Sequence, residues 1–258
     1  MQARVSAFLN LMGLSLVLAV NALANVLPIN GYNTGQVSGF YPNYFVPAGF
    51  TFGIWGGIYF MLIGFVMCSI IAAVAVTPSA VQQLLERAGP IFQITCLLNA
   101  AWIVAWQYLF LGTSLVIMLV FLVMLVRLYL RIKPLKSDVP LFYRFWIHHS
   151  FVVYLAWISV ATIANFTALF VGLGWQGEPL SPQTWAFMLV CIGLLLGVYV
   201  VGRLKEPAFG FVFAWAFFGI YANQVGPSRL VGLGAAFAVC FILALTITIL
   251  VRTRKIVQ

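Results

Sequence analysis

Residues 50–76, FTFGIWGGIYFMLIGFVMCSIIAAVAV, decide the fold class of this chain. The stretch is 27 residues long and contains no charged residue. It therefore exceeds the roughly 20 apolar residues that an α-helix needs to cross a bilayer. The hydrocarbon core of a membrane excludes charge and accepts an apolar surface on all sides of a helix. We therefore expect residues 50–76 to form a membrane-spanning helix.

Seven further apolar runs lie before and after this stretch. The run 208–223 is the shortest of them and contains glycine, so it is the least regular of the expected spans. The sequence predicts an all-α fold, a polytopic transmembrane bundle of about eight helices. Besides 50–76, the expected spans are 5–27, 91–111, 114–130, 145–173, 184–204, 208–223 and 230–251.

The composition excludes a soluble protein. Of the 258 residues, 64% are hydrophobic and only 7% are charged, whereas about a quarter are charged in a soluble domain. The net charge of +9 would attract the phosphates of a nucleic acid. The basic residues flank the apolar runs, however, where they anchor and orient helices. We therefore expect membrane lipids, and no nucleic acid, as the surroundings of this chain.

The basic residues also test the helix count. If the N-terminus lies in the cytoplasm and each run crosses once, twelve of the thirteen Lys and Arg residues fall inside and only Arg229 falls outside. This asymmetry follows the positive-inside rule and predicts that both termini lie in the cytoplasm. The inside residues are Arg4, Arg87, Arg127, Arg131, Lys133, Lys136, Arg144, Arg203, Lys205, Arg252, Arg254 and Lys255.

The first run has a second interpretation. Arg4, the apolar stretch after it and Ala22-Leu23-Ala24 resemble a secretory signal peptide with its cleavage site. The apolar stretch is longer than a usual signal core. We therefore favour a first helix that is not cleaved.

The segment 28–49, between the first two expected spans, is the longest outer loop and carries no charge. Long loops in compact proteins are often functional, for example as lids over a binding site. The other interpretation is an ordered cap that only ties two helices together.

Charged residues and cysteines offer little catalytic chemistry here. The sequence shows no paired carboxylates, no Ser/His/Asp set, no CxxC pair and no acidic residue deep in a span. We therefore do not predict enzyme activity. The four cysteines lie in apolar runs and are interpreted as small buried side chains. They are Cys68, Cys96, Cys191 and Cys240.

His148 and His149 are the two histidines, and they lie beside Arg144 and Trp146 at the cytoplasmic end of the fifth expected span. A histidine near a helix can ligate the metal of haem or chlorophyll. An interfacial pair beside basic residues is more commonly solvated. We therefore predict no metal site, with this pair as its only weak candidate.

Neutral polar and aromatic side chains inside the spans are the remaining candidates for function. In lipid, polar groups are costly unless they pair with one another or face a cavity. Residues three or four apart share one face of a helix. Such sets are Asn21 with Asn25, Trp55 with Tyr59, Asn99 with Trp102 and Trp106, next to Gln107, and Trp157 with Ala161 and Asn165.

The expected orientation brings these sets to one level of the membrane. Because the first, third and fifth spans run outward and the second runs inward, Asn25, Trp55, Trp106 and Asn165 all fall in the outer half, beneath the 28–49 loop. A pocket with aromatic walls and a few polar groups is a usual small-molecule site. The same spacing also allows these side chains simply to hold helices together.

Three motifs resemble the TspO/MBR family, the tryptophan-rich sensory proteins. Residues 46–55, VPAGFTFGIW, resemble its Pro-Pro-Gly-Trp-x-Phe-Gly-Pro-x-Trp signature. Residues 97–102, LLNAAW, resemble the Leu-x-Leu-Asn-x-x-Trp of its third helix. Residues 154–165, YLAWISVATIAN, resemble the Tyr-x-x-Trp-x-x-x-Ala-x-x-x-Asn of its fifth helix. The motifs occur in family order and spacing.

The resemblance implies a function. Family members are five-helix bundles that bind porphyrins, haem, cholesterol or synthetic ligands in a pocket closed by the loop after the first helix. It also implies a multi-pass protein of a bacterial cytoplasmic membrane. Combined with the helical spacing, it gives a set of candidate ligand-binding residues. They are Asn25, Phe50, Trp55, Tyr59, Asn99, Trp102, Trp106, Trp157, Ala161 and Asn165.

The first motif departs from the family pattern. Ala48 stands at its second proline and Phe50 at its first tryptophan, and Trp55 arrives one residue early. One residue on a helix rotates a side chain by about 100°. We therefore expect Trp55 to be rotated away from the position of the family's tryptophan.

The resemblance also divides the chain. It covers residues 1–173 as a TspO-like five-helix bundle and leaves residues 174–258 as a three-helix membrane extension. One short internal repeat, which we call the internal echo, extends into residues 174–258. The step from Ala156-Trp157 to Ala164-Asn165 recurs from Ala214-Trp215 to Ala222-Asn223. A duplication, a second polar site or, as we favour, coincidence would explain it.

Three functions fit these observations. The first is a receptor or carrier for an apolar ligand, a tetrapyrrole such as porphyrin or haem or a lipid-like molecule, oriented by Asn99 and Asn165. The second is a structural or assembly subunit of a larger, pigment-binding membrane complex. The third is an enzyme that acts on a bound tetrapyrrole. A homodimer or a membrane-complex partner is compatible with the first two.

Overall fold

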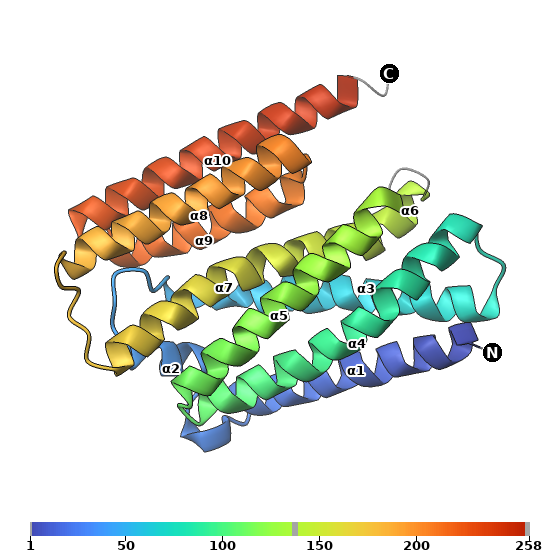
Figure 1. The fold of residues 1–258 in the computed structure, drawn as a ribbon, viewed down its shortest axis with the longest axis horizontal. Coiled ribbons are helices and arrows are strands. Elements are labelled where there is room, and N and C mark those ends of the chain that lie inside the picture. The colour runs from blue at the N-terminus through green and yellow to red at the C-terminus, as the bar shows by residue number, and fades with distance from the viewer. Residues whose placement is uncertain (1, 136–138, 256–258) are drawn as a thin grey trace. The chain divides into compact units, whose positions relative to one another are not determined.

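The computed structural model describes residues 2–135 and 139–255, and within these ranges it contains helices and no strand (Figure 1). Lys136, one of the expected cytoplasmic residues, lies outside them. The chain divides into two compact units. The first unit contains Met1–Val37 and Gly53–Leu155, and the second contains Ser38–Phe52 and Ala156–Gln258. The division falls within helix α7 (Ser150–Gly172).

The first unit is built on four long helices. Helix α1 packs against α3 and α4, and α4 packs against α5 (Figure 1). Short helical turns join them, and α7 begins in this unit. The long helices are α1 (Gln2–Asn25), α3 (Ile54–Val74), α4 (Ser79–Gln107) and α5 (Leu111–Ile132). The short elements are η1 (Ile29–Gly31), α2 (Thr34–Gly39), whose end lies in the second unit, η3 (Lys133–Leu135), α6 (Leu141–Arg144) and η4 (Phe145–His149).

Helix α4 begins well before the expected start of the third span at residue 91. It runs from Ser79 through Pro90, although a proline removes one helical hydrogen bond and usually kinks or ends a helix. The preceding residues Val81, Leu84 and Ala88 are completely buried. Burial of this face therefore outweighs the cost of the proline. A search for continuous apolar runs does not detect such a face, because its buried residues alternate with polar ones.

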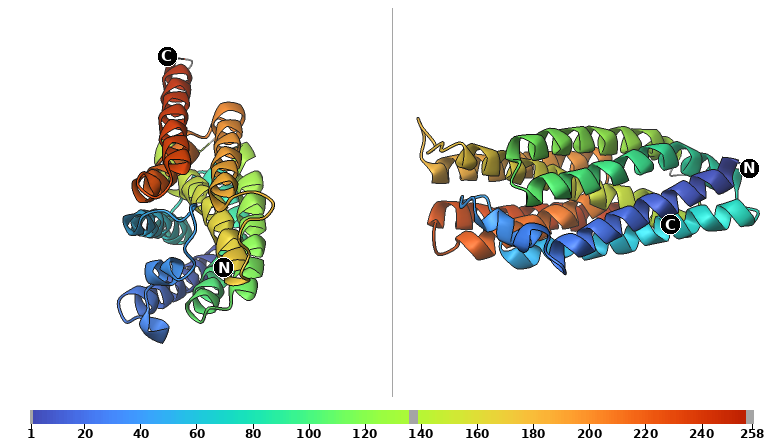
Figure 2. Two further views of the ribbon diagram at one scale, coloured as in Figure 1. Left: turned by 90° about the vertical axis from the view of Figure 1, so that its left-hand side faces the viewer. Right: turned by 90° about the horizontal axis from the view of Figure 1, so that it is seen from below.

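The second unit consists of the loop 38–52, the C-terminal part of α7 and three further helices. These three lie side by side in each view of Figure 2, and each packs against the other two. They are α8 (Pro182–Leu204), α9 (Pro207–Gln224) and α10 (Arg229–Lys255). Ser181 caps α8 by accepting a hydrogen bond from the amide of Thr184 at 3.1 Å, and Pro182 follows at the first helical position. The loop ends in the short turn η2 (Gly49–Gly53).

Seven helical segments of the described residues are long and apolar enough to cross a membrane. Helix α9 is not among them, because its 18 residues end in the polar pair Asn223-Gln224. It nevertheless lies where the seventh span was expected, and 18 residues of helix extend about 27 Å, close to the thickness of the hydrocarbon core. The fold is therefore a polytopic all-α bundle, and the eighth crossing stays a prediction.

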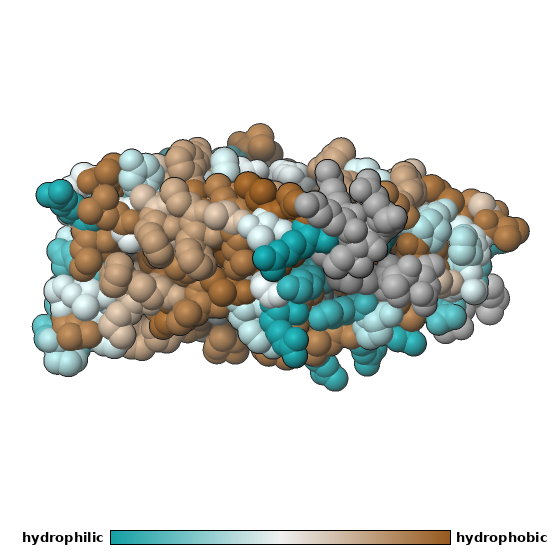
Figure 3. Space-filling model, turned by 90° about the horizontal axis from the view of Figure 1, so that it is seen from above, coloured by the Kyte–Doolittle hydropathy of each residue, from teal (hydrophilic) through white to brown (hydrophobic). Residues whose placement is uncertain are grey.

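The surface of the second unit fits a lipid environment. The helices α8 to α10 show a broad apolar surface with hydrophilic groups toward its ends (Figure 3). Large apolar side chains such as Leu195, Phe237 and Phe241 are exposed there. Since such a surface cannot face water over this area, the chain is an integral, multi-pass membrane protein.

His148 does not have the solvated environment that we expected. Its side chain is completely buried, and its ring lies 6.0 Å from the ring of Tyr129. Residues Phe145–His149 form a π-helical turn, which changes the register of the side chains between α6 and α7. The sequence shows no sign of this turn, so the orientation of His148 was not predictable.

Candidate functional site

Four aromatic rings form a continuous stack in the first unit. Trp55 and Tyr59 of α3 have ring centroids 5.5 Å apart, and Trp102 and Trp106 of α4 have centroids 6.1 Å apart. Trp55 and Trp102 join the two pairs at 6.0 Å, with their planes inclined by 30°. Each pair is four residues apart on its helix, which places both rings on one face. We call Tyr59, Trp55, Trp102 and Trp106 the aromatic stack.

A chain of amides and a hydroxyl runs beside this stack. Asn21 donates to the side-chain oxygen of Asn99 at 3.1 Å, and the amide nitrogen of Asn99 donates to the hydroxyl of Tyr154 at 2.9 Å. The Tyr154 ring meets the Trp55 ring edge-on, with centroids 6.1 Å apart. Asn99 is completely buried. The spacing of Asn99 predicted its place beside the tryptophans, but it did not predict that Asn21 and Tyr154 hold its amide.

Buried polar atoms without a partner lie at the same level. The indole nitrogen of Trp102, the side-chain oxygen of Gln107 and the hydroxyl of Thr34 make no hydrogen bond to the residues that the structure describes. Their neighbours are satisfied: Trp106 donates to the carbonyl oxygen of Thr34 at 3.2 Å, and Gln107 donates to that of Ala24 at 2.8 Å. An unpaired buried donor costs about 1–3 kcal/mol. A ligand with a hydrogen-bond acceptor would remove that cost at Trp102.

Asn25 has a structural role in this unit. Its side chain is exposed, and its oxygen accepts a hydrogen bond from the backbone amide of Thr34 at 3.3 Å. It therefore ties the end of α1 to the start of α2.

The other four predicted residues belong to the second unit. Phe50 is 48% exposed, and its ring packs against Trp215 at 5.5 Å and Phe218 at 5.8 Å. Trp157 meets Phe52 edge-on at 6.3 Å. Ala161 is partly exposed and Asn165 is buried, four and eight residues after Trp157 on α7.

Helix α9 holds the end of the outer loop, residues 43–51, which we call the strap. The amides of Asn223 and Gln224 donate to the carbonyl oxygen of Val46 at 3.0 Å and 3.3 Å. Further along, Trp215 donates to the carbonyl oxygen of Thr51 at 2.9 Å. Trp215 and Asn223 are the residues of the internal echo, so in the structure they anchor the strap.

Close approach of the strap to α9 requires a glycine. The carbonyl oxygen of Gly219 accepts a hydrogen bond from the amide of Ala48 at 2.9 Å. A Cβ atom at position 219 would collide with the side chain of Thr51. Trp215, Gly219 and Asn223 are four residues apart, so one face of α9 carries the whole contact.

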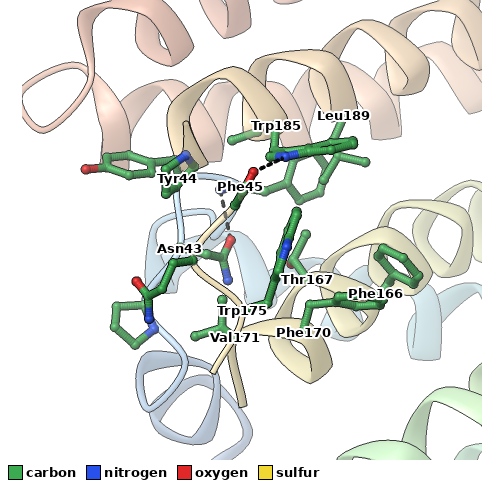
Figure 4. A pocket seen from close by; sticks show the side chains of 15 residues that line it. Asn43, Tyr44, Phe45, Phe166, Thr167, Phe170, Val171, Trp175, Trp185 and Leu189 are labelled. Carbon is green, nitrogen blue, oxygen red and sulfur yellow. Dashed lines mark hydrogen bonds between the residues drawn. The ribbon is translucent and has the colours of Figure 1, made fainter. Parts of the chain in front are cut away.

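The strap forms one wall of a cavity of about 520 Å³ within the second unit (Figure 4). Its other walls come from the C-terminal end of α7, the connection 175–177 and the first turns of α8. None of the ten predicted ligand-binding residues lines it. The lining residues are Pro42, Asn43, Tyr44, Phe45, Phe166, Thr167, Phe170, Val171, Trp175, Gln176, Gly177, Pro182, Trp185, Ala186 and Leu189.

Aromatic rings dominate this cavity. The rings of Phe170 and Trp175 are 5.5 Å apart and inclined by 73°, and those of Trp175 and Trp185 are 5.4 Å apart and inclined by 60°. Phe166 adds a ring 4.4 Å from that of Phe170. Figure 4 shows these side chains and Phe45 around a common space. The rings meet edge-on or tilted, so they present faces and edges in several directions.

Comparison with family models tests the resemblance of the three sequence motifs. The model of the family described as TSPO-like protein matches residues 7–250. The chain belongs to the TSPO-like protein family. No curated protein and no solved structure matches the chain.

The TSPO-like family model extends past residue 173, where the recognisable motifs end. The match therefore includes α8, α9 and most of α10. The expected division at residue 173 stays a prediction, since the two compact units follow packing. It also remains a prediction that all ten candidate residues share one ligand.

Sequence reasoning missed the cavity of this TSPO-like chain because its rings are not in helical register. Trp175 lies in the connection between α7 and α8, and Trp185 lies in the first turn of α8. The available signal was two tryptophans ten residues apart, on either side of Gly177 and Pro182. Tryptophans at a span boundary usually belong to the interfacial aromatic belt, so this signal was weak.

Proposed function

We propose that this TSPO-like protein is a membrane receptor or carrier for an apolar ligand, a tetrapyrrole or a lipid-like molecule, bound at the aromatic stack. One observation carries the proposal: the buried indole N–H of Trp102 lacks a hydrogen-bond partner among the described residues. Structures rarely leave such a donor without an explanation, and a bound acceptor is one.

The surroundings of Trp102 support this assignment. Its ring is 5% exposed and stacks on Trp55 and Trp106, so a planar ligand there would meet aromatic faces. Asn99 is held rigidly by Asn21 and Tyr154, which lets it orient a polar edge of the ligand. By the family resemblance, Phe50, Trp157, Ala161 and Asn165 of the second unit are further candidate ligand-binding residues.

The experiment is a titration of the purified full-length protein with protoporphyrin IX and with haem, followed by absorbance. We expect saturable binding of at least one of them. Trp102→Phe keeps an aromatic ring and removes the donor, so it should weaken binding by about tenfold, the value of one hydrogen bond. Trp185→Phe, which removes an indole donor that is already paired with the carbonyl oxygen of Gly177 and is not one of the ten candidate residues, is the matched control.

Two outcomes would contradict the proposal. One is that neither tetrapyrrole, nor a sterol offered as a lipid-like ligand, binds at all. The other is equal binding by the wild type and Trp102→Phe. Absence of binding together with stable co-purification of other membrane subunits would favour the structural or assembly role instead.

A further inference from the structure

We infer that the cavity of the second unit is a second binding site, for an uncharged ring compound that carries one hydrogen-bond acceptor. The cavity shares no residue with the aromatic stack. Its volume of about 520 Å³ lies within the range of about 300–1,000 Å³ that is usual for small-molecule pockets.

The lining determines that the ligand is uncharged. No Lys, Arg, His, Asp or Glu is among the fifteen lining residues. An ionised group placed among such walls would lose its hydration and gain no opposite charge. A tetrapyrrole with ionised carboxylates therefore fits this cavity poorly, whereas a neutral ring does not pay that cost.

The polar atoms of the lining restrict the ligand further, because most of them are already paired. Trp185 donates to the carbonyl oxygen of Gly177 at 2.6 Å, and Thr167 donates to that of Ala164 at 2.7 Å. Asn43 accepts from the amide of Phe45 at 2.9 Å, an interaction drawn in Figure 4.

Trp175 is the exception among the tryptophans of the lining. Its indole N–H makes no hydrogen bond to the residues that the structure describes, and its side chain is only partly buried. It lies between the rings of Phe170 and Trp185. A ligand ring that packs against these side chains can therefore place one carbonyl or hydroxyl oxygen at the Trp175 donor.

The walls of the cavity are fixed before a ligand arrives. Gln224 and Asn223 hold the strap through the carbonyl oxygen of Val46, and Gln183 donates to the hydroxyl of Tyr44 at 3.0 Å. Gly177 has a φ of 99°, which suits glycine, and its carbonyl oxygen positions the Trp185 ring. A preformed site loses less conformational entropy on binding than a flexible one.

Three probes with one ring system test the inference: pyrene, 1-acetylpyrene and pyrene-1-carboxylate. Pyrene has no acceptor, the acetyl derivative adds one carbonyl, and the carboxylate adds a charge. Binding is measured by probe anisotropy with the full-length protein in phosphatidylcholine nanodiscs, and empty nanodiscs give the lipid background. We expect 1-acetylpyrene to bind most tightly and the carboxylate at least about tenfold more weakly, because the lining offers no counter-charge.

Four variants locate the site. Val171→Trp and Ala186→Phe each fill the cavity and should abolish binding of both neutral probes, whereas Ile192→Trp, on the exposed face of α8, should not. Trp175→Phe should weaken 1-acetylpyrene by about tenfold, the effect of one hydrogen bond, and leave pyrene unchanged. The two filling variants guard against the failure of either one to fold.

Three results would overturn the inference. They are binding of the carboxylate as tight as that of 1-acetylpyrene, wild-type affinity in both filling variants, and an equal loss for pyrene and 1-acetylpyrene in Trp175→Phe. Trp102→Phe, the variant that tests the aromatic stack, should leave all three affinities unchanged. The second site therefore stands or falls independently of the proposed function.

Discussion

The aromatic stack of the first unit and the cavity of the second unit use similar residues in opposite ways. In the stack, Tyr59, Trp55, Trp102 and Trp106 lie parallel or nearly so, and each ring faces the next. In the cavity, the rings are tilted or edge-on and enclose about 520 Å³. Whether aromatic rings enclose a pocket therefore depends on where the backbone anchors them, and not on how many rings there are.

The anchoring differs for a simple geometric reason. Rings four residues apart on two packed helices face the same groove, and they meet there. Trp175 and Trp185 instead come from a connection and from a helix start, where the backbone direction changes between them. Their rings can converge on a space without filling it.

The polar atoms show the reverse contrast. Among the described residues, the indole N–H of Trp102 in the stack has no hydrogen-bond partner, while most polar side-chain atoms around the cavity have protein partners. We therefore expect the stack to depend on recognition of a polar edge and the cavity to depend on shape. The following predictions test that difference.

The largest effect should come from Gly219→Ala. The new Cβ atom collides with Thr51 and displaces the strap, so binding of 1-acetylpyrene should be lost and stability should fall by about 1–3 kcal/mol. The measurements are probe anisotropy and thermal unfolding in nanodiscs. Gly202→Ala on α8, where a Cβ meets nothing within 4 Å, is the control and should stabilise the protein by up to about 1 kcal/mol. Equal behaviour of the two variants would show that the strap does not depend on this contact.

A smaller loss is expected when the amides of α9 are removed. Asn223→Ala combined with Gln224→Ala deletes the side-chain hydrogen bonds to Val46. At about 1 kcal/mol for each bond, affinity for 1-acetylpyrene should fall by about tenfold or somewhat more. Protoporphyrin binding should not change. If the double variant binds 1-acetylpyrene as the wild type does, the strap is held by other contacts.

Tyr154→Phe should affect only the stack. It removes the hydroxyl that accepts from Asn99 and leaves a buried amide N–H without that partner, which costs about 1–3 kcal/mol of stability. Tetrapyrrole affinity should fall several-fold because Asn99 loses its fixed orientation, and 1-acetylpyrene affinity should stay the same. A matching loss for both ligands would remove the distinction between the two regions.

The smallest effect should be that of pH on the cavity. No Lys, Arg, His, Asp, Glu or Cys is among its lining residues, so the lining carries no group that changes charge near neutral pH. Affinity for 1-acetylpyrene should therefore be flat from about pH 5 to about pH 9. A titration with a midpoint in this interval would mean that an ionisable group outside the lining controls the site.

Much of the fold was predictable because membrane-spanning helices have a strong signal. The apolar runs placed the eight long helices close to their observed positions, as for 208–223 against α9 (Pro207–Gln224). The exceptions are local. Pro90 concealed the first turns of α4, and the π-helical turn Phe145–His149 changed the environment of His148. Both depend on packing, which apolar runs do not record.

The candidate site was predictable only where helical spacing determines the contacts. Spacing on one face predicted the neighbours Trp55 with Tyr59 and Trp102 with Trp106, and the family motifs pointed to Asn99. Helical spacing could not predict that Trp215 and Asn223 hydrogen-bond to the strap, because those contacts depend on the path of the loop. The contact between the rings of Trp175 and Trp185 was equally unpredictable, because it depends on the path of the connection between α7 and α8.

The most direct test of the two-region account is a crossed titration. Wild type, Trp102→Phe and Val171→Trp are each titrated with protoporphyrin IX and with 1-acetylpyrene in the same nanodiscs. The account predicts that Trp102→Phe weakens only the tetrapyrrole and that Val171→Trp abolishes only the binding of 1-acetylpyrene. A loss of both ligands in either variant would contradict it.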